Sequence, residues 1–311
     1  MISFRQLRYF DALVRHRHFG RAAEHCSVTQ PALSMQIKEL EQTLGVRLVE
    51  RRGSAITITE EGREVARRSE GILASVADLT DFARHRKKPL TGQLRLGIIP
   101  SIAPYLLPDT LPVLQQRFPE LDLQVRETQT NALVDELIGG ELDVIVAALP
   151  MAHAQIDTMP LFDDEFLVAV ASSDAAAWQG ADVRQRLTQQ RVLLLEEGHC
   201  LRDQALQFCS LPSGTARRTL GATSLTTIIQ MVAAGYGVTL LPKLCAGIEV
   251  RDARITLLRF GEDVPRRTIG LAWRRTSPRK RDYLALGQTI LATRAVGEGG
   301  ALPGDPGAGS A

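Results

Sequence analysis

Buried strand patterns and helix patterns alternate from about residue 90 to residue 296, and this alternation limits the possible folds most strongly. Short aliphatic runs in this region look like strands that are covered on both faces. They are the runs 94–99, 121–125, 143–147, 165–171, 192–195, 238–241 and 268–273. Helix patterns at 106–118, 131–138, 225–234 and 279–293 separate or follow them. We therefore expect an α/β fold, with helices packed on the faces of its sheets.

The first 59 residues show a different pattern. Apolar spacing over 4–14, the run 19–25 and a segment that opens at Thr29-Gln30-Pro31 predict three helices. Alternating runs on either side of Arg52-Gly53-Ser54 predict a hairpin after them. Helix, turn and helix followed by a hairpin is the winged helix-turn-helix arrangement of DNA-binding domains. Residues 1–88 carry 16 lysines and arginines against 11 acidic residues, a balance that suits a nucleic acid partner.

Polar side chains of the third helix and basic side chains of the hairpin are the candidate contacts to double-stranded promoter DNA. We expect the start and outer side of that helix to enter the major groove. The tip of the hairpin is expected to reach phosphates or the minor groove. The candidate residues are Gln30, Pro31, Ser34, Lys38, Arg51 and Arg52.

Residues 60–88 predict one long linker helix that ends before Pro89. Its apolar stripe repeats near the seven-residue period of a coiled coil, which indicates that it pairs two chains. The stripe consists of Val65, Ile72, Val76, Leu79 and Phe82. Residues 89–296 would then form a separate effector domain. The stretch 297–311, rich in Gly, Ala and Pro, is expected to be disordered.

Cys200 and Cys209 lie at the two ends of a predicted helix that follows the buried run 192–195. The partial positive charge of a helix N-terminus favours a thiolate over a thiol at Cys200. Nine residues of helix span roughly 13–14 Å, whereas a disulfide needs Cα atoms within about 7 Å. If these cysteines ever pair, the helix must unwind or move. The plain alternative is that both are small buried hydrophobic residues.

The rest of the composition narrows the class of protein. The N-terminal MISFRQLRYF lacks the apolar core of a signal peptide, and no run approaches the length of a transmembrane helix. Four cysteines are too few for a disulfide scaffold. We expect a cytoplasmic protein without a membrane partner. No Gly-rich phosphate loop, G-x-S-x-G elbow or H-E-x-x-H helix occurs, which argues against common enzyme classes.

Residues 1–59 resemble the DNA-binding domain of LysR-type transcriptional regulators. The runs that carry this resemblance are 7–10, 19–23, 29–34, 37–41 and 44–48. Residues 92–283 are similar to the effector region of the peroxide-sensing members of that family. The matching runs are 99–101, 105–108, 196–205, 208–209, 222–225, 231–235, 239–242 and 266–271. The resemblance implies two α/β subdomains of the periplasmic-binding-protein type after the winged helix-turn-helix and the linker helix.

The resemblance also implies roles for residues. Cys200 would be the peroxidatic thiol and Cys209 the resolving thiol. Side chains around them would form a peroxide pocket: Ser101, Thr130, His199, Arg202, Asp203 and Arg267. The family usually has threonine where this chain has Ser101, so the hydroxyl is kept.

The chain departs from the family pattern at two positions, and two of its cysteines have no counterpart in that pattern. Thr219 and Gly221 replace a histidine and an arginine that are often seen in the family, and both bear on the balance between the reduced and oxidised forms. Cys26 and Cys245 match no family role, and we expect them to be structural.

These expectations combine into a homo-oligomeric regulator, dimer or tetramer, that senses hydrogen peroxide and activates transcription with RNA polymerase. It would be no enzyme and would need no cofactor and no metal. One alternative is a LysR-type regulator that binds a small organic acid between its subdomains, with structural cysteines. Another is a thiol-dependent peroxidase with a DNA-binding arm. A metal site at His199, Cys200 and Cys209 is disfavoured, because the predicted helix holds the two sulfurs apart.

Overall fold

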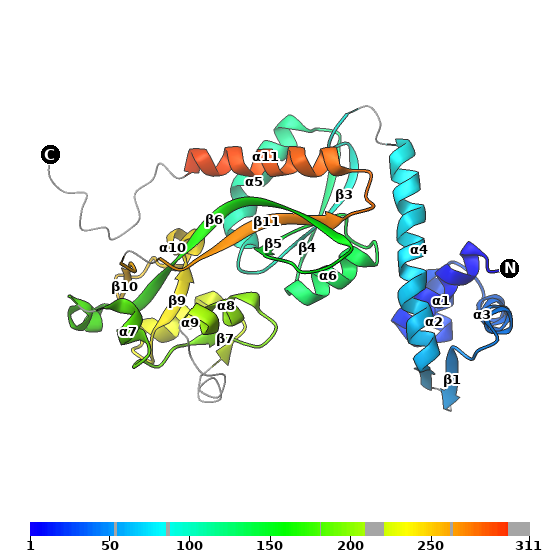
Figure 1. Ribbon diagram of the computed structural model, residues 1–311, viewed down its shortest axis with the longest axis horizontal. Helices are drawn as coiled ribbons and strands as arrows, with labels where there is room; N and C mark the ends of the chain where they lie inside the picture. Colours follow the sequence, from blue (N-terminus) through cyan, green and yellow to red (C-terminus); the bar gives the residue numbers. More distant parts are fainter. Residues whose placement is uncertain (53–54, 85–87, 181, 209–220, 262–263, 298–311) are drawn as a thin grey trace. The chain divides into compact units, whose positions relative to one another are not determined.

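The computed structural model describes residues 1–52, 55–84, 88–180, 182–208, 221–261 and 264–297 of the chain. The chain divides into two units (Figure 1). The N-terminal unit is residues 1–86, with the short stretches 138–141 and 276–278 grouped beside it. The regulatory unit contains the rest of the chain from residue 87 onward.

The N-terminal unit is a winged helix-turn-helix, as predicted. Its elements are α1 (Phe4–His16), α2 (Phe19–His25), α3 (Gln30–Leu44), β1 (Val49–Arg52), β2 (Ala55–Ile58) and α4 (Glu60–Arg84). Phe10, Leu13, Leu33 and Leu40 are fully buried between the helices. The Glu41 carboxylate accepts the backbone N–H groups of Leu48 and Val49 at 2.7 and 3.2 Å, which fixes the hairpin against α3.

The long helix α4 leaves apolar side chains uncovered. Ile72 is 50% exposed and Leu79 is 68% exposed, and Val76 is exposed beside them. Val65, the first residue of the predicted stripe, packs partly buried against the core of the N-terminal unit, and the side chain of Phe82, the last one, lies outside the described part of the chain. An apolar stripe of this kind on a long helix is available to a second helix.

The regulatory unit is built on one seven-stranded mixed sheet, in the order β10-β6-β11-β5-β3-β4, with β9 also paired to β6. Its strands are β3 (Gly92–Ile98), β4 (Leu121–Glu127), β5 (Val144–Leu149), β6 (Ile156–Ala171), β9 (Thr239–Pro242), β10 (Ile255–Leu258) and β11 (Arg266–Arg274). β3 runs parallel to β4 and β5, whereas β11 runs antiparallel to β5 and β6. The predicted α/β class is therefore confirmed.

Two subdomains share the long strands β6 and β11 (Figure 1). The first subdomain is β3–β5 with α5 (Ala103–Arg117), α6 (Thr130–Ile138) and α11 (Lys280–Gly297). The chain steps from β3 outward to β4 and then back past β3 to β5, and since such connections between parallel strands are right-handed, α5 and α6 lie on opposite faces of the sheet. The second subdomain begins where β6 leaves β11 and pairs with β9 and β10. It holds the 3-10 helix Ser172–Trp178, α7 (Val183–Leu187), β7 (Leu194–Leu195), α8 (Cys200–Phe208), β8 (Gly221–Ala222), α9 (Leu225–Ala233) and α10 (Lys243–Glu249).

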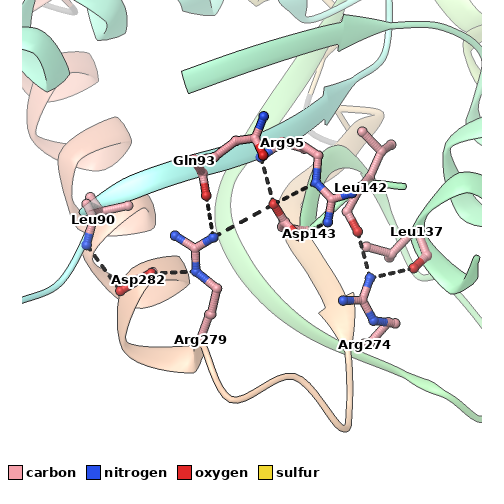
Figure 2. A network of polar contacts seen from close by, with 9 residues as sticks. All are labelled: Leu90, Gln93, Arg95, Leu137, Leu142, Asp143, Arg274, Arg279 and Asp282. Atoms are coloured by element: carbon pink, nitrogen blue, oxygen red, sulfur yellow. Dashed lines mark hydrogen bonds and ion pairs between the residues drawn. The ribbon is translucent and has the colours of Figure 1, made fainter. Parts of the chain in front are cut away.

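A polar network secures the start of the regulatory unit (Figure 2). The backbone N–H of Leu90, a fully buried residue, donates to Asp282 Oδ1 at 3.1 Å. Arg279 Nε donates to the same carboxylate at 2.8 Å, and its Nη1 donates to the Gln93 carbonyl at 2.6 Å. The first residues of β3 are thereby fixed to the N-terminal turn of α11.

The same network extends to the loop between α6 and β5 (Figure 2). Arg95 forms an ion pair with Asp143 at 2.6 Å. Arg274 Nη1 donates to the Leu137 carbonyl at 2.8 Å, at the C-terminal end of α6, and to the Leu142 carbonyl at 2.7 Å, just before β5. Arg279 joins the two parts of the network, because its Nη1 also forms an ion pair with Asp143 at 3.8 Å.

The structure corrects one expected boundary and contains elements that the sequence pattern did not predict. The predicted strand 165–171 is only the second half of β6, which begins at Ile156 and pairs with β11 along its first half. Helix α10 and strand β10 were not expected from the sequence pattern. Within the described ranges, no helix combines the length and apolar character needed to cross a membrane. The predicted disordered tail falls on residues 298–311, apart from its first residue, and these lie outside the described residues.

Candidate functional site

Cys200 is the first residue of α8, as the sequence pattern indicated, and its side chain is half-buried. The turn that leads to it contains Gly198 with φ +93°, a backbone conformation that suits glycine. A Cβ at Gly198 would lie 2.4 Å from the Oε1 atom of Gln129, so a side chain there would displace the Gln129 carboxamide. The sulfur is held at a defined place between the two subdomains.

A small cavity adjoins Cys200. Its lining residues come from the β3–α5 turn, the start of α6 and the start of α8: Ile99, Pro100, Ser101, Gln129, Thr130, Gly198, His199, Cys200 and Leu201. Its volume is about 10 Å³, close to the roughly 10–15 Å³ that one water molecule needs. The cavity therefore suits a very small polar molecule.

The electrostatic setting of this cavity favours an anion. Thr130 opens α6 and Cys200 opens α8, so the N-termini of two nine-residue helices border the cavity. Each helix N-terminus carries partial positive charge and unpaired N–H groups. The buried Thr130 hydroxyl has no hydrogen-bond partner among the described residues, which leaves it available to a molecule in the cavity.

Arg267 stands behind the cavity and does not line it. Its Nη1 donates to Ser101 Oγ at 2.8 Å, and its Nη2 donates to the Ser101 carbonyl at 3.1 Å. Ser101 is 5% exposed and lines the cavity. Arg267 thus acts on the site through Ser101, whose hydroxyl and carbonyl it orients.

Asp164 neutralises Arg267 in the interior. The two residues face each other across β6 and β11. Arg267 Nε donates to Asp164 Oδ2 at 3.0 Å, and the side chains of both residues are 1% exposed. Asp164 Oδ1 accepts the backbone N–H of Leu244 at 2.9 Å, at the start of α10. This buried ion pair joins the shared strands to the second subdomain.

Besides Arg267, two further residues that the resemblance assigns to the peroxide pocket do not line the cavity. Arg202 Nη1 donates to the Leu195 carbonyl at 3.0 Å, which ties α8 to β7. Asp203 is exposed on α8. The predicted residues Ser101, Thr130, His199 and Cys200 are brought together at the cavity.

The cysteines differ in their surroundings. Cys26 and Cys245 are buried, and burial raises the pKa of both thiols. Cys245 donates to the Ser101 carbonyl at 3.7 Å and is fully buried. Cys200 is the only described cysteine that lines the small cavity. The second predicted redox cysteine, Cys209, lies outside the described residues, as does Thr219.

A larger cavity of about 170 Å³ lies beside the small one and shares Pro100, Ser101 and His199 with it. Glu127 and Glu249 line it, together with hydroxyl groups, but no lysine or arginine is among its described lining residues. Tyr105 donates to Glu249 at 2.7 Å. The lining also contains His199 and the residues that open α9 (Leu225–Ala233), so it combines groups that repel an organic acid with groups that attract one.

The candidate DNA contacts lie on α3 and the hairpin. Gln30, Pro31 and Lys38 are exposed, and Ser34 is partly exposed on the same helix. Arg51 and Arg52 belong to β1. Their side chains lie outside the described part of the chain.

Sequence reasoning missed Gln129 and Asp164. Gln129 directly precedes the predicted pocket residue Thr130, and this adjacency is the one signal that could have found it. No spacing rule connects Asp164 with Arg267, which is 103 positions further along.

In the described ranges, no group of three or more His, Cys, Asp or Glu side chains is arranged to hold a metal ion.

Both units of the chain match known protein families. Residues 4–63 match the family described as "Bacterial regulatory helix-turn-helix protein, lysR family", and residues 87–295 match the "LysR substrate binding domain". The chain is 40% identical to a "Probable hydrogen peroxide-inducible genes activator" of Streptomyces viridosporus, over 93% of each chain. It is 39% identical to the "DNA-binding transcriptional dual regulator OxyR" of Escherichia coli, over 94% of this chain and 95% of the relative.

Solved structures of similar proteins match the fold as well. A full-length OxyR variant from Pseudomonas aeruginosa is 36% identical, with a TM-score of 0.76, and the match covers 94% of this chain and 98% of that one. A Corynebacterium glutamicum OxyR variant described as H₂O₂-bound is 31% identical, with a TM-score of 0.66 and 97% coverage of both chains.

Proposed function

This chain belongs to the LysR family of bacterial regulatory proteins, and on that basis we propose that it is a transcriptional regulator that senses hydrogen peroxide through Cys200. The observation that supports this most directly is the cavity beside the Cys200 side chain. It has room for one very small molecule, it is bordered by two helix N-termini, and the Thr130 hydroxyl beside it is unpaired within the described chain. Hydrogen peroxide is the smallest and a highly polar peroxide, so among peroxides it needs the least room beyond this water-sized space.

The chemistry begins at the Cys200 sulfur. The thiolate attacks one peroxide oxygen, the O–O bond breaks, and the other oxygen leaves as hydroxide, which takes a proton and becomes water. The sulfur loses two electrons and becomes a sulfenic acid. Ser101 and Thr130 supply hydroxyl groups that hydrogen-bond the peroxide, and Arg267 holds Ser101 in place.

The second step forms a disulfide between Cys200 and Cys209. The Cys209 sulfur attacks the sulfenic sulfur, the S–O bond breaks, and the hydroxyl leaves as water after taking up the thiol proton. Each molecule reacts once per oxidation, so the reaction is a signal and not enzymatic turnover. We assign sensing to residues 89–296 and leave the tail 297–311 without a role.

Residues 1–59 carry DNA binding and residues 60–88 pair two chains. Gln30, Pro31, Ser34 and Lys38 face the major groove, and Arg51 and Arg52 reach phosphates or the minor groove. The exposed stripe on α4 is the seam between two chains. Dimers, or tetramers made from them, bind promoter DNA in the cytoplasm and activate transcription with RNA polymerase.

Thiol titration of the purified, reduced chain tests the sensing chemistry. The chain has four cysteines, and we expect one equivalent of hydrogen peroxide to remove two titratable thiols under denaturing readout. Cys200→Ser should keep its remaining thiols under the same treatment. Cys245→Ser is the matched control, because the Cys245 thiol of the wild-type chain is buried and burial raises its pKa. This variant should still lose two titratable thiols. Retention of all four thiols in the wild-type chain would contradict the proposal.

DNA binding can be tested by its dependence on salt concentration. Lys38 is exposed on α3, so Lys38→Ala should weaken promoter binding and reduce the log–log slope of affinity against salt by roughly one unit for each phosphate that the variant no longer neutralises. Lys280→Ala, an exposed lysine at the start of α11, should leave affinity and slope unchanged. Equal slopes for Lys38→Ala and the wild-type chain would remove Lys38 from the DNA interface.

A further inference from the structure

Gln129 occupies a fixed position at the junction of β4 and α6. The backbone N–H of Thr128 donates to the Ile98 carbonyl at 3.3 Å, at the last residue of β3. The Gln129 carbonyl accepts the N–H of Leu133 at 3.0 Å, in the first turn of α6. The backbone on both sides of the Gln129 side chain is therefore tied to the first subdomain.

The Gln129 carboxamide packs on the turn that precedes Cys200. An ideal Cβ at Gly198 would lie 2.4 Å from Oε1 and 2.8 Å from Cδ of Gln129. Because Gly198 has no side chain, the carboxamide can take this position without displacement. The carboxamide of the first subdomain thus lies directly against the Cys200 turn of the second subdomain.

Gln129 has the cavity on one side and solvent on the other. It is among the residues that line the small cavity beside Cys200. The residue as a whole is nevertheless exposed, unlike Ser101 and Leu201, which line the same cavity and are buried. Gly198, on which the carboxamide packs, is the other exposed residue of the lining, so the contact between Gln129 and Gly198 lies on the solvent side of the cavity.

We propose that the Gln129 side chain is the outer wall of the peroxide pocket and determines which hydroperoxides reach Cys200. This inference rests on the proposed function. A hydroperoxide ROOH reacts at its terminal oxygen: the S–O bond forms, the O–O bond breaks, and RO⁻ leaves and takes a proton as the alcohol. In hydrogen peroxide R is a hydrogen atom, which needs no space beyond the pocket that Gln129 borders. A bulky alkyl group must occupy the space that the Gln129 carboxamide fills.

The test compares the rates at which the full-length chain reacts with hydrogen peroxide and with tert-butyl hydroperoxide. Stopped-flow fluorescence or quenched thiol titration gives both second-order rate constants. Gln129→Ala removes the wall, so the rate constant for the bulky peroxide relative to that for hydrogen peroxide should rise by about tenfold or more, the scale on which pocket size discriminates between substrates. Gln129→Met keeps nearly the same volume without the amide and should keep the wild-type ratio.

Gln124→Ala provides the matched control, because Gln124 is exposed on β4 and does not line the cavity. Its ratio should equal that of the wild-type chain. An unchanged ratio in Gln129→Ala, with normal reactivity toward hydrogen peroxide, would overturn the inference. A ratio that rises as much in Gln129→Met as in Gln129→Ala would also overturn it, because the side-chain volume would then not be the cause. Failure of the wild-type chain to react with hydrogen peroxide would instead overturn the proposed function.

Discussion

Asp164→Ala should lower the free energy of unfolding of this protein by about 3–5 kcal/mol, as measured by urea denaturation. The substitution leaves the Arg267 guanidinium charged and 1% exposed, without the carboxylate that neutralises it. It also leaves the Leu244 N–H without its acceptor at the start of α10. A buried charge that is deprived of its partner costs far more than an exposed one, because water cannot replace the partner.

A double variant separates the charge effect from the change in packing. In Asp164→Leu combined with Arg267→Met, both charges are removed and both volumes are largely kept. The double variant should therefore be less destabilised than Asp164→Ala, because apolar groups of similar volume can replace a buried pair at little cost. An exposed pair gives the scale: Arg275→Ala, which removes a 3.0 Å ion pair with Asp157, should change stability by about 1 kcal/mol or less.

The same substitution links stability to sensing. Arg267 orients the hydroxyl and carbonyl of Ser101, so Asp164→Ala should also slow the reaction of Cys200 with hydrogen peroxide. If Asp164→Ala unfolds at the same urea concentration as the wild-type chain and reacts at the same rate, the ion pair does not support the pocket as described.

Much of the fold could be predicted from local pattern because most elements carry their own signal. The helices α1, α2 and α3 follow from apolar spacing, a capping serine before Phe4 and the proline at the start of α3. The first half of β6 could not be found in this way. It contains Pro160 and acidic residues, which disfavour a strand locally, and it is extended because β11 pairs with it along that half.

The candidate site was predictable where its residues follow one another in the sequence. The buried run, the turn with Gly198 and the helix from Cys200 are one continuous stretch, and the structure places Cys200 at the helix N-terminus. Contacts between distant segments were not predictable. The sequence cannot show that Arg267 turns its guanidinium toward Ser101 and Asp164, or that Gln129 packs on Gly198.

The second large effect concerns α8, which should become non-helical on oxidation. From Cys200 to Phe208 the helix advances about 12 Å along its axis at 1.5 Å per residue. One further residue changes this distance by at most about 3.8 Å. The Cα atoms of residues 200 and 209 are therefore at least about 8 Å apart while α8 is intact, and a disulfide requires about 7 Å or less.

Closing the disulfide consequently requires α8 to unwind. The disulfide does not require the sheet of the regulatory unit to change. Strand β3, for example, lies inside the sheet between β5 and β4, and its residues Leu94 and Ile98 are fully buried. The effect of oxidation should be confined to the second subdomain near Cys200. The hydrogen bond from Arg202 to the Leu195 carbonyl, which ties α8 to β7, should break when the helix unwinds.

Hydrogen exchange of the reduced and peroxide-treated chain, read by mass spectrometry, measures this change most directly. We expect the amides of residues 201–208 to be protected in the reduced chain and to exchange much faster once mass analysis confirms the Cys200–Cys209 disulfide. The amides of β3 should be unaffected, and Cys209→Ser should form the sulfenic acid without the change in exchange. Residues 201–208 that stay protected in a chain with the confirmed disulfide would contradict the switch proposed here.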